Sequence, residues 1–184
     1  MYKKYFKRLL DILFSLLLLI VLFLPGLIIA ILSKINTGQI FYMQKRDGKN
    51  KKSFTMYKFC SMKNIEGSYM ERTTKVTRVM RSLGLDELPQ LINILKGDMS
   101  FVGPRPFITG EELPSKPSDK IYKVRPGVIS LAVAQGRRKI NHEMRLKYDE
   151  VYVSNVCLKQ DIIILIKTLG VLIKQNVRGD VWKK

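Results

Sequence analysis

Asp86 and Glu87 form an acidic pair in a chain that has 15 acidic residues against 33 basic ones. The pair stands before an apolar pattern typical of a helix, so helix capping is one interpretation. Basic residues nearby in the sequence favour an ionised carboxylate with a low pKa. An ionised aspartate can act as a nucleophile, and a neighbouring glutamate can bind a hard divalent cation. The basic residues are Arg72, Lys75, Arg78, Arg81 and Lys96.

Three turn-borne basic clusters could bind phosphate groups. Residues 103–106 read Gly-Pro-Arg-Pro, so two prolines restrict the backbone around Arg105. A pre-organised guanidinium loses less entropy when its planar fork binds a phosphate, although a rigid surface turn would read the same way. Arg-Pro-Gly at 125–127 and Gln-Gly-Arg-Arg-Lys at 135–139 are the other clusters. Together they predict a site for a multiply charged phosphate compound.

The composition narrows the class of protein. A formal charge of +18 on 184 residues predicts an anionic partner: nucleic acid, an anionic membrane or a phosphorylated substrate. A hydrophobic fraction of 46% excludes a disordered chain. Two cysteines and the single His142 argue against a disulfide scaffold, a four-cysteine zinc site and histidine-based catalysis. The chain has no helix-turn-helix or aromatic-basic motif, so we expect no nucleic-acid partner.

Residues 12–32 form an apolar segment about 31 Å long as a helix, which is enough to cross a bilayer core. Both flanks are basic, and basic flanks prefer the cytoplasmic side. Pro25-Gly26 predicts a kink, and a helix that bends back keeps both flanks on one side. The alternative is a single kinked span. We therefore expect a re-entrant membrane helix over residues 1–35 and a cytosolic catalytic domain over residues 36–184 that rests on the membrane surface.

The elements that must position the charged residues are short. Residues 39–44 and 53–59 predict two strands joined by a turn at Asp47-Gly48, unless 45–52 is a disordered basic loop. Helices are predicted over 74–83, 86–95, 141–154 and 160–175, with a break at Gly84 and a loop over 97–106. The expected fold class is α+β and mostly helical. A re-entrant N-terminal membrane helix would continue into a small cytosolic domain with a β-hairpin and interfacial amphipathic helices.

Three segments carry a resemblance to a known family. They read Tyr-Lys-Phe-Cys-Ser-Met at 57–62, Arg-Ser-Leu-Gly-Leu-Asp-Glu-Leu-Pro-Gln at 81–90, and Lys-Gly-Asp-Met-Ser-Phe-Val-Gly-Pro-Arg-Pro at 96–106. In this order and spacing the chain resembles the bacterial sugar transferase family, the monotopic polyprenyl-phosphate phosphoglycosyl transferases. The resemblance extends from the basic N-terminus to Asp161.

The resemblance implies an activity and a place in the cell. The enzyme would transfer a sugar 1-phosphate from a UDP-sugar to undecaprenyl phosphate and release UMP, as the first membrane step of surface-glycan assembly. It would lie on the cytoplasmic face of the bacterial inner membrane as a monotopic protein. The sequence does not name the sugar or the glycan, and it leaves open whether the enzyme is a homodimer.

The resemblance also implies roles for individual residues. Asp86 would be the nucleophile that forms a covalent aspartyl-phosphosugar intermediate, and Glu87 would bind magnesium with Asp86. The family's other basic and acidic positions, implied to bind substrate, match Lys58, Arg81, Arg105, Arg137, Asp149 and Asp161.

Some positions depart from the family pattern. The family's Thr, Gly and Gln are missing from the Ile-Ser-Leu-Ala-Val stretch at 129–133, Cys60 replaces a basic residue, and Ile163 replaces a lysine. These changes bear on nucleotide and sugar specificity. Two other functions fit the composition: a non-catalytic, membrane-anchored basic adaptor for anionic lipid or nucleic acid, and a polyprenyl diphosphate hydrolase. UMP release that requires polyprenyl phosphate would separate the transferase from both.

Overall fold

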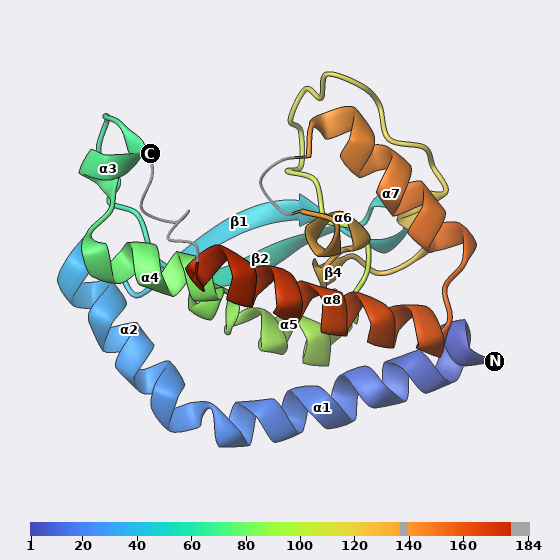
Figure 1. Ribbon diagram of the computed structural model, residues 1–184, viewed down its shortest axis with the longest axis horizontal. Coiled ribbons are helices and arrows are strands. Elements are labelled where there is room, and N and C mark those ends of the chain that lie inside the picture. Colours follow the sequence, from blue (N-terminus) through green and yellow to red (C-terminus); the bar gives the residue numbers. More distant parts are fainter. Residues whose placement is uncertain (137–139, 178–184) are drawn as a thin grey trace.

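A computed structural model describes residues 1–136 and 140–177, except for the side chains of Lys4 and of 173–177. The chain opens with a π-helical turn, Tyr2–Phe6, which continues into α1, Lys7–Val21, and α2, Phe23–Thr37. Figure 1 shows α1 and α2 as a bent pair along one side of a smaller mixed domain. The expected α+β, mostly helical class is confirmed.

The bend lies one turn before the position that the sequence predicts. The helical conformation breaks at Leu22, with φ −95° and ψ 12°, and not at Pro25-Gly26. Pro25 occupies the first turn of α2, where a missing N–H costs no helix hydrogen bond. A proline ring clashes with the carbonyl four residues earlier, which here belongs to Val21, so the strain appears at the end of α1. Within the described residues no single helix suffices to cross a bilayer, whereas the α1–α2 pair has the required length and composition but is bent by 69°.

The predicted hairpin is confirmed. Strand β1, Phe41–Asp47, pairs antiparallel with β2, Ser53–Phe59, and its start lies two residues later than expected. The basic stretch between them is an ordered turn with a short 3₁₀ segment, Lys49–Lys51, so the alternative of a disordered loop is wrong. The exposed ion pair between Lys51 and Asp119, at 2.7 Å, links this turn to a second 3₁₀ segment, Ile121–Lys123.

A second, parallel pair of strands was not predicted. Strand β3, Ser100–Val102, pairs with β4, Gly127–Ile129. Immediately after β3, a Cβ atom added at Gly103 would lie 2.5 Å from the carbonyl oxygen of Arg125, and one at Gly127 would collide with the backbone of Gly103. The glycines of the Gly-Pro-Arg-Pro and Arg-Pro-Gly clusters are therefore required where the two loops pack backbone to backbone.

Helix α4, Lys75–Leu83, has the predicted ends: the Thr74 side chain caps its N-terminus, and Gly84 ends it with a left-handed φ of 74°. A 3₁₀ turn, Leu85–Glu87, follows, and α5 begins only at Gln90 and runs to Lys96. The expectation of a helix starting at Asp86 is thus wrong, because in a continuous α-helix the Pro89 ring would clash with the carbonyl of Leu85, four residues earlier. The remaining helices are α3 (Tyr69–Arg72), α6 (Leu131–Ala134), α7 (His142–Ser154) and α8 (Leu158–Val177).

Polar side chains of α1 fasten it to the mixed domain. Asp11 is buried, and one of its oxygens accepts hydrogen bonds from the Ser100 hydroxyl and from the Phe101 N–H, both at 3.1 Å. The Arg8 guanidinium donates to the carbonyl oxygens of Ile94 and Leu95 at the end of α5. These contacts fix the side of α1 that faces the domain and leave its opposite side free of polar anchors.

Exposed apolar side chains cover the outer sides of α1 and α2. Leu9, Leu13, Ile20 and Phe23 are each more than half exposed. Exposed apolar residues also lie on α4 and α8, including Ile166, which is 64% exposed. Contiguous apolar surface of this kind marks an interaction site or a membrane contact.

Candidate active site

Asp86 lies on the 3₁₀ turn between α4 and α5 and is 6% exposed. One of its oxygens accepts a hydrogen bond from the Ser61 hydroxyl at 3.1 Å, and the Arg81 guanidinium lies 3.9 Å from the same oxygen. Arg81 also donates to the Ser61 oxygen at 3.0 Å. Ser61 therefore links the Arg81 cation to the Asp86 carboxylate and fixes its orientation.

Glu87 forms an ion pair with Lys58, at 2.7 Å, between side chains that are 25% and 17% exposed. Lys58 comes from β2 and Glu87 from the 3₁₀ turn that precedes α5, and buried Asn93 of α5 ties that helix to β2. The Asn93 side chain accepts from the Tyr57 N–H at 3.0 Å and donates to the Thr55 carbonyl at 2.7 Å. Each acid therefore has its own cation: Lys58 of the hairpin lies against Glu87, and Arg81 of α4 lies near Asp86.

The pKa of Asp86 is raised above its usual value, not lowered. Burial is the largest cause, and the neighbouring charge of Glu87 adds to it. Lys58, Arg81 and the Ser61 hydrogen bond act in the opposite direction but are outweighed. The expectation of a low pKa is therefore wrong, because the sequence shows the nearby cations but not the loss of solvent.

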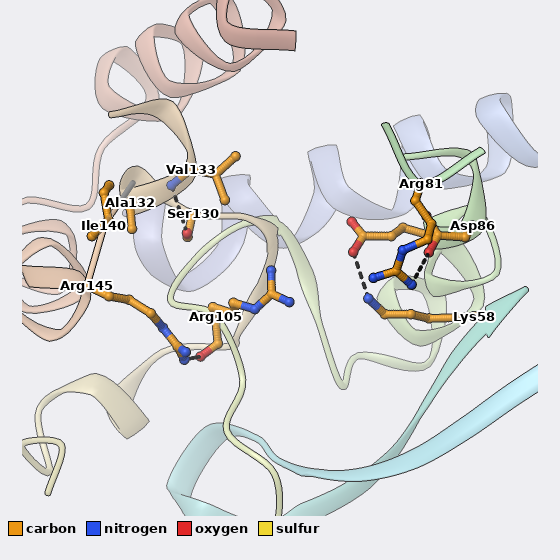
Figure 2. Close-up of a pocket in the computed structure, with 10 residues that line it drawn as sticks. Lys58, Arg81, Asp86, Arg105, Ser130, Ala132, Val133, Ile140 and Arg145 are labelled. Atoms are coloured by element: carbon orange, nitrogen blue, oxygen red, sulfur yellow. Dashed lines mark hydrogen bonds and ion pairs between the residues drawn. The ribbon is translucent and has the colours of Figure 1, made fainter. Parts of the chain in front are cut away.

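A cavity of about 370 Å³ opens beside the acidic pair. Figure 2 shows two groups of residues around it, with the Arg105 side chain between them. One group carries Asp86, Glu87, Lys58 and Arg81, and the other lies on and beside α6 and α7. The lining of the second group consists of Ser130, Ala132, Val133, Ile140 and Arg145. The cavity combines two acids with four cations, which suits a multiply charged anion.

A second cavity, of about 440 Å³, meets the first at Asp86. Lys58, Arg81, Asp86 and Arg105 line both. The additional lining of the second cavity includes Tyr42, Arg46, Cys60, Ser61, Lys63 and Arg72. Asp86 thus has a cavity on each side, which leaves room for two substrates or for the two halves of one.

Asp149, which the resemblance places among the substrate-binding residues, lies behind Arg105 and does not line either cavity. It is fully buried on α7, and one of its oxygens lies 3.7 Å from the Arg145 Nε. Arg145 also donates to the Arg105 carbonyl at 3.0 Å. Asp149 therefore acts on the cavity through Arg145, which holds the Arg105 loop.

The buried carboxyl of Asp149 gives a pH dependence of stability. Burial raises its pKa to about 7, although Arg145 and Arg105 lower it. The pKa of an aspartate in the unfolded chain is about 4. Between that pH and the folded pKa, the folded chain binds more protons than the unfolded chain, so the free energy of unfolding falls as the pH rises. The fall is at most about 1.4 kcal/mol per pH unit. We expect Asp149→Asn to flatten the decline of Tm between pH 5 and 7, and an unchanged slope would contradict the assignment.

Asp161 lies away from the acidic pair. Its carboxylate accepts hydrogen bonds from Tyr2, Lys7 and Tyr152, and the last of these measures 2.8 Å. These partners connect the start of α8 with α7 and the N-terminal end of α1. The structure therefore gives Asp161 a place in the attachment of α1 and does not bring it to the cavity. The predicted phosphate-binding Arg137 lies outside the described residues.

Sequence reasoning missed three residues of the site. Ser61 stands within one of the recognised segments, but a serine beside an acid carries no signal of its own. Arg145 is one of several charges along its helix, and Arg46 stands near the end of β1, in the basic stretch that the sequence predicts as the hairpin turn. The only signal for Arg145 in the sequence was its position among apolar residues, on the side of the predicted helix that faces the core.

Comparisons with known proteins place the chain in a family. The family described as bacterial sugar transferase matches residues 2–175. The exopolysaccharide production protein ExoY of Sinorhizobium fredii is 36% identical, over 89% of this chain and 83% of the relative. The undecaprenyl-phosphate galactose phosphotransferase of Salmonella typhimurium is 34% identical, over 94% of this chain and 41% of the relative. A UDP-glucose:undecaprenyl-phosphate glucose-1-phosphate transferase of Klebsiella pneumoniae is 35% identical, over 89% and 39%.

Buried Asp86 and partly exposed Glu87 lie beside cavities lined by several cations, a distribution of charge that suits a phosphorylated compound. The chain belongs to the bacterial sugar transferase family. It spans most of the first relative and under half of the other two.

Proposed function

We propose that this protein transfers a sugar 1-phosphate from a UDP-sugar to undecaprenyl phosphate, with release of UMP. The observation that carries the proposal is the pairing of Asp86 and Glu87 with Lys58, Arg81 and Arg105 around one cavity. The names of the relatives supply the substrate class, since two of them are undecaprenyl-phosphate sugar phosphotransferases.

In the first half of the reaction, a carboxylate oxygen of Asp86 attacks the phosphorus that carries the sugar. A P–O bond forms to Asp86, and the P–O bond to UMP breaks, with its electron pair leaving on UMP. Approach of one anion to another is opposed by repulsion, which Arg81, Lys58 and Arg105 reduce. Burial helps, because a carboxylate with a raised pKa is the more basic nucleophile.

In the second half, an oxygen of polyprenyl phosphate attacks the same phosphorus. The bond to Asp86 breaks, and its carboxylate is restored, while the sugar leaves as a polyprenyl diphosphate derivative. No proton needs to move in either half if both attacking groups are ionised. The two cavities that meet at Asp86 would let the nucleotide leave on one side while the acceptor enters on the other.

The acidic pair fits a magnesium ion that is held mainly by its substrate. Magnesium commonly binds one or two carboxylates together with substrate phosphates and water. Asp86 and Glu87 offer two such carboxylates at the cavity, and the described residues contain no group of three acidic, histidine or cysteine side chains. Bound there, the ion would neutralise charge on the diphosphate.

The test is a screen of UDP-sugars for UMP release by the purified chain in detergent, with magnesium and undecaprenyl phosphate. Sustained release that requires the acceptor supports the transferase. Phosphate release from a polyprenyl diphosphate, without UMP from any UDP-sugar, would support the hydrolase instead. Binding of anionic lipid without release of UMP or of phosphate would support the non-catalytic adaptor.

We also propose that residues 1–35 dip into the cytoplasmic leaflet and return, so that 36–184 form a catalytic domain on the membrane surface. The bend of 69° and the exposed apolar sides of α1 and α2 support this arrangement. Exposed apolar residues on α4 and α8, among them Val79 and Ile166, would rest at the interface.

This topology predicts that a cysteine placed near Lys3 escapes a membrane-impermeant label added outside the cell. Pro25→Ala restores an N–H that can bond to the Val21 carbonyl, so it should straighten the helix pair and increase labelling. The labelling experiment uses a chain whose Cys60 and Cys157 are replaced by serine, with a cysteine near Lys75 as the cytoplasmic control. Efficient labelling near Lys3 with Pro25 intact would mean a true span.

Arg105 is expected to act on the substrate and not on folding. Its side chain is exposed between the two groups of cavity residues. Arg105→Lys keeps the charge but loses the bidentate fork, so we expect a loss of kcat/KM of about tenfold to a hundredfold with an unchanged Tm. Arg78→Lys, which changes an arginine that lines neither cavity, is the matched control. Turnover of Arg105→Lys at the wild-type rate would exclude a specific phosphate contact.

A further inference from the structure

A third cavity, of about 320 Å³, lies at the N-terminal end of α1 and shares no residue with the two around Asp86. Five of its ten lining residues are cations. Lys3 and Lys7 come from the start of the chain, Lys49 from the hairpin turn, and Lys123 and Arg125 from the segment that leads into β4. These five cations gather from three distant parts of the sequence.

The walls of this cavity are fixed by contacts that do not use its free cationic groups. The hydrogen bonds of Asp11 to Ser100 and Phe101 hold α1 in place. The ion pair of Lys51 with Asp119 holds the hairpin turn against the segment of Lys123. A cationic pocket whose walls are already ordered loses little entropy when an anion binds.

The acids near the cavity leave most of its positive charge uncompensated. Asp161 pairs with Lys7. Asp11 is the acid in the cavity lining, and one of its oxygens accepts the two hydrogen bonds from Ser100 and Phe101. Arg125 donates its Nε to the Gly97 carbonyl, which leaves its charge in place. Within residues 1–136 and 140–177, no ion pair or hydrogen bond engages the ammonium groups of Lys3, Lys49 and Lys123. The positive charges of these side chains repel one another, and an anion bound between them would relieve this repulsion.

We propose that this cavity binds a phosphate group, separately from the catalytic site, through Lys3, Lys49, Lys123 and Arg125. Ammonium and guanidinium groups form charge-assisted hydrogen bonds to phosphate oxygens, and several of them converge here. A phosphodiester headgroup of an anionic phospholipid and a free phosphate share this chemistry. The lipid is the favoured source, because the exposed apolar side of the same helix carries Phe6, Leu9 and Leu13. A headgroup bound here would hold the N-terminal end of α1 at the membrane surface.

The test measures binding to the full chain in a neutral detergent by isothermal titration. The probes are dihexanoyl phosphatidylglycerol, dihexanoyl phosphatidylcholine and inorganic phosphate, each as single molecules in solution. The variant is Lys49→Gln with Lys123→Gln. Both side chains are exposed, so we expect the double substitution to leave the fold intact. Lys116→Gln with Lys147→Gln removes the same charge from exposed positions that line none of the three cavities. Arg105→Gln removes a cation from the catalytic cavity.

We expect phosphatidylglycerol to bind wild type, and to bind the Lys49/Lys123 variant more weakly by about fivefold for each lysine. The Lys116/Lys147 and Arg105 variants should bind like wild type. Equal loss with inorganic phosphate would assign the site to free phosphate, and loss with the lipid alone would assign it to a headgroup. The proposal would be overturned if the Lys116/Lys147 variant bound as weakly as the Lys49/Lys123 variant, or if only Arg105→Gln bound more weakly. It would also be overturned if phosphatidylcholine bound as tightly as phosphatidylglycerol, or if neither phosphatidylglycerol nor inorganic phosphate bound.

Discussion

Asp86→Asn should reduce turnover by at least about a thousandfold while leaving the fold intact. An amide is a very poor nucleophile towards phosphorus, so no covalent intermediate can form. The asparagine oxygen can still accept the Ser61 hydrogen bond, and the substitution removes a buried charge whose pKa is raised by burial. The Tm should therefore equal or slightly exceed that of wild type.

The measurement is acceptor-dependent UMP release, with Asp119→Asn as the matched control at an exposed position outside the catalytic cavities. Wild type incubated with UDP-sugar and magnesium, without acceptor, should carry a sugar-phosphate adduct on the peptide that contains Asp86. An adduct on another peptide, or substantial UMP release by Asp86→Asn, would show that the nucleophile lies elsewhere.

Glu87→Gln should lower turnover by about a hundredfold and shift its magnesium dependence to higher concentrations. The amide keeps the shape of the side chain but removes a charged oxygen ligand and the ion pair with Lys58. Because both partners are partly exposed, the loss of that pair should cost little stability.

Glu143→Gln, on the exposed side of α7, is the control for the loss of one acid. Magnesium titrations of initial rate separate a metal role from a purely electrostatic one. If the rate falls but the magnesium concentration at half-maximal rate stays the same, Glu87 acts through Lys58 and not as a ligand.

Local features of this protein were readable in the sequence, because each depends on residues that are close along the chain. Thr74 and Gly84 define the ends of α4 through a side-chain cap and a left-handed backbone. The alternating strands around Asp47-Gly48 define the hairpin in the same way. The three segments that resemble the family pointed to Asp86 and Glu87 as the catalytic residues, since the order and spacing of these segments can be read without knowing the fold.

Features that depend on long-range contacts had to come from the tertiary structure. The pairing of β3 with β4 joins two segments that residues 103–126 separate in the sequence. Asp161 sits with Tyr2 and Lys7 because α8 folds back to the beginning of the chain. No local sequence pattern encodes such contacts between residues far apart along the chain.

The electrostatics of the nucleophile show the same division. From five cations nearby in the sequence we predicted a low pKa for Asp86, and of these five only Arg81 acts on the carboxyl in the structure, together with Lys58. The tertiary structure decided that the carboxyl is almost withdrawn from water and stands beside Glu87, so its pKa is raised. The physical reason is that charge is a property of residue type, whereas desolvation is a property of what packs around the residue after folding.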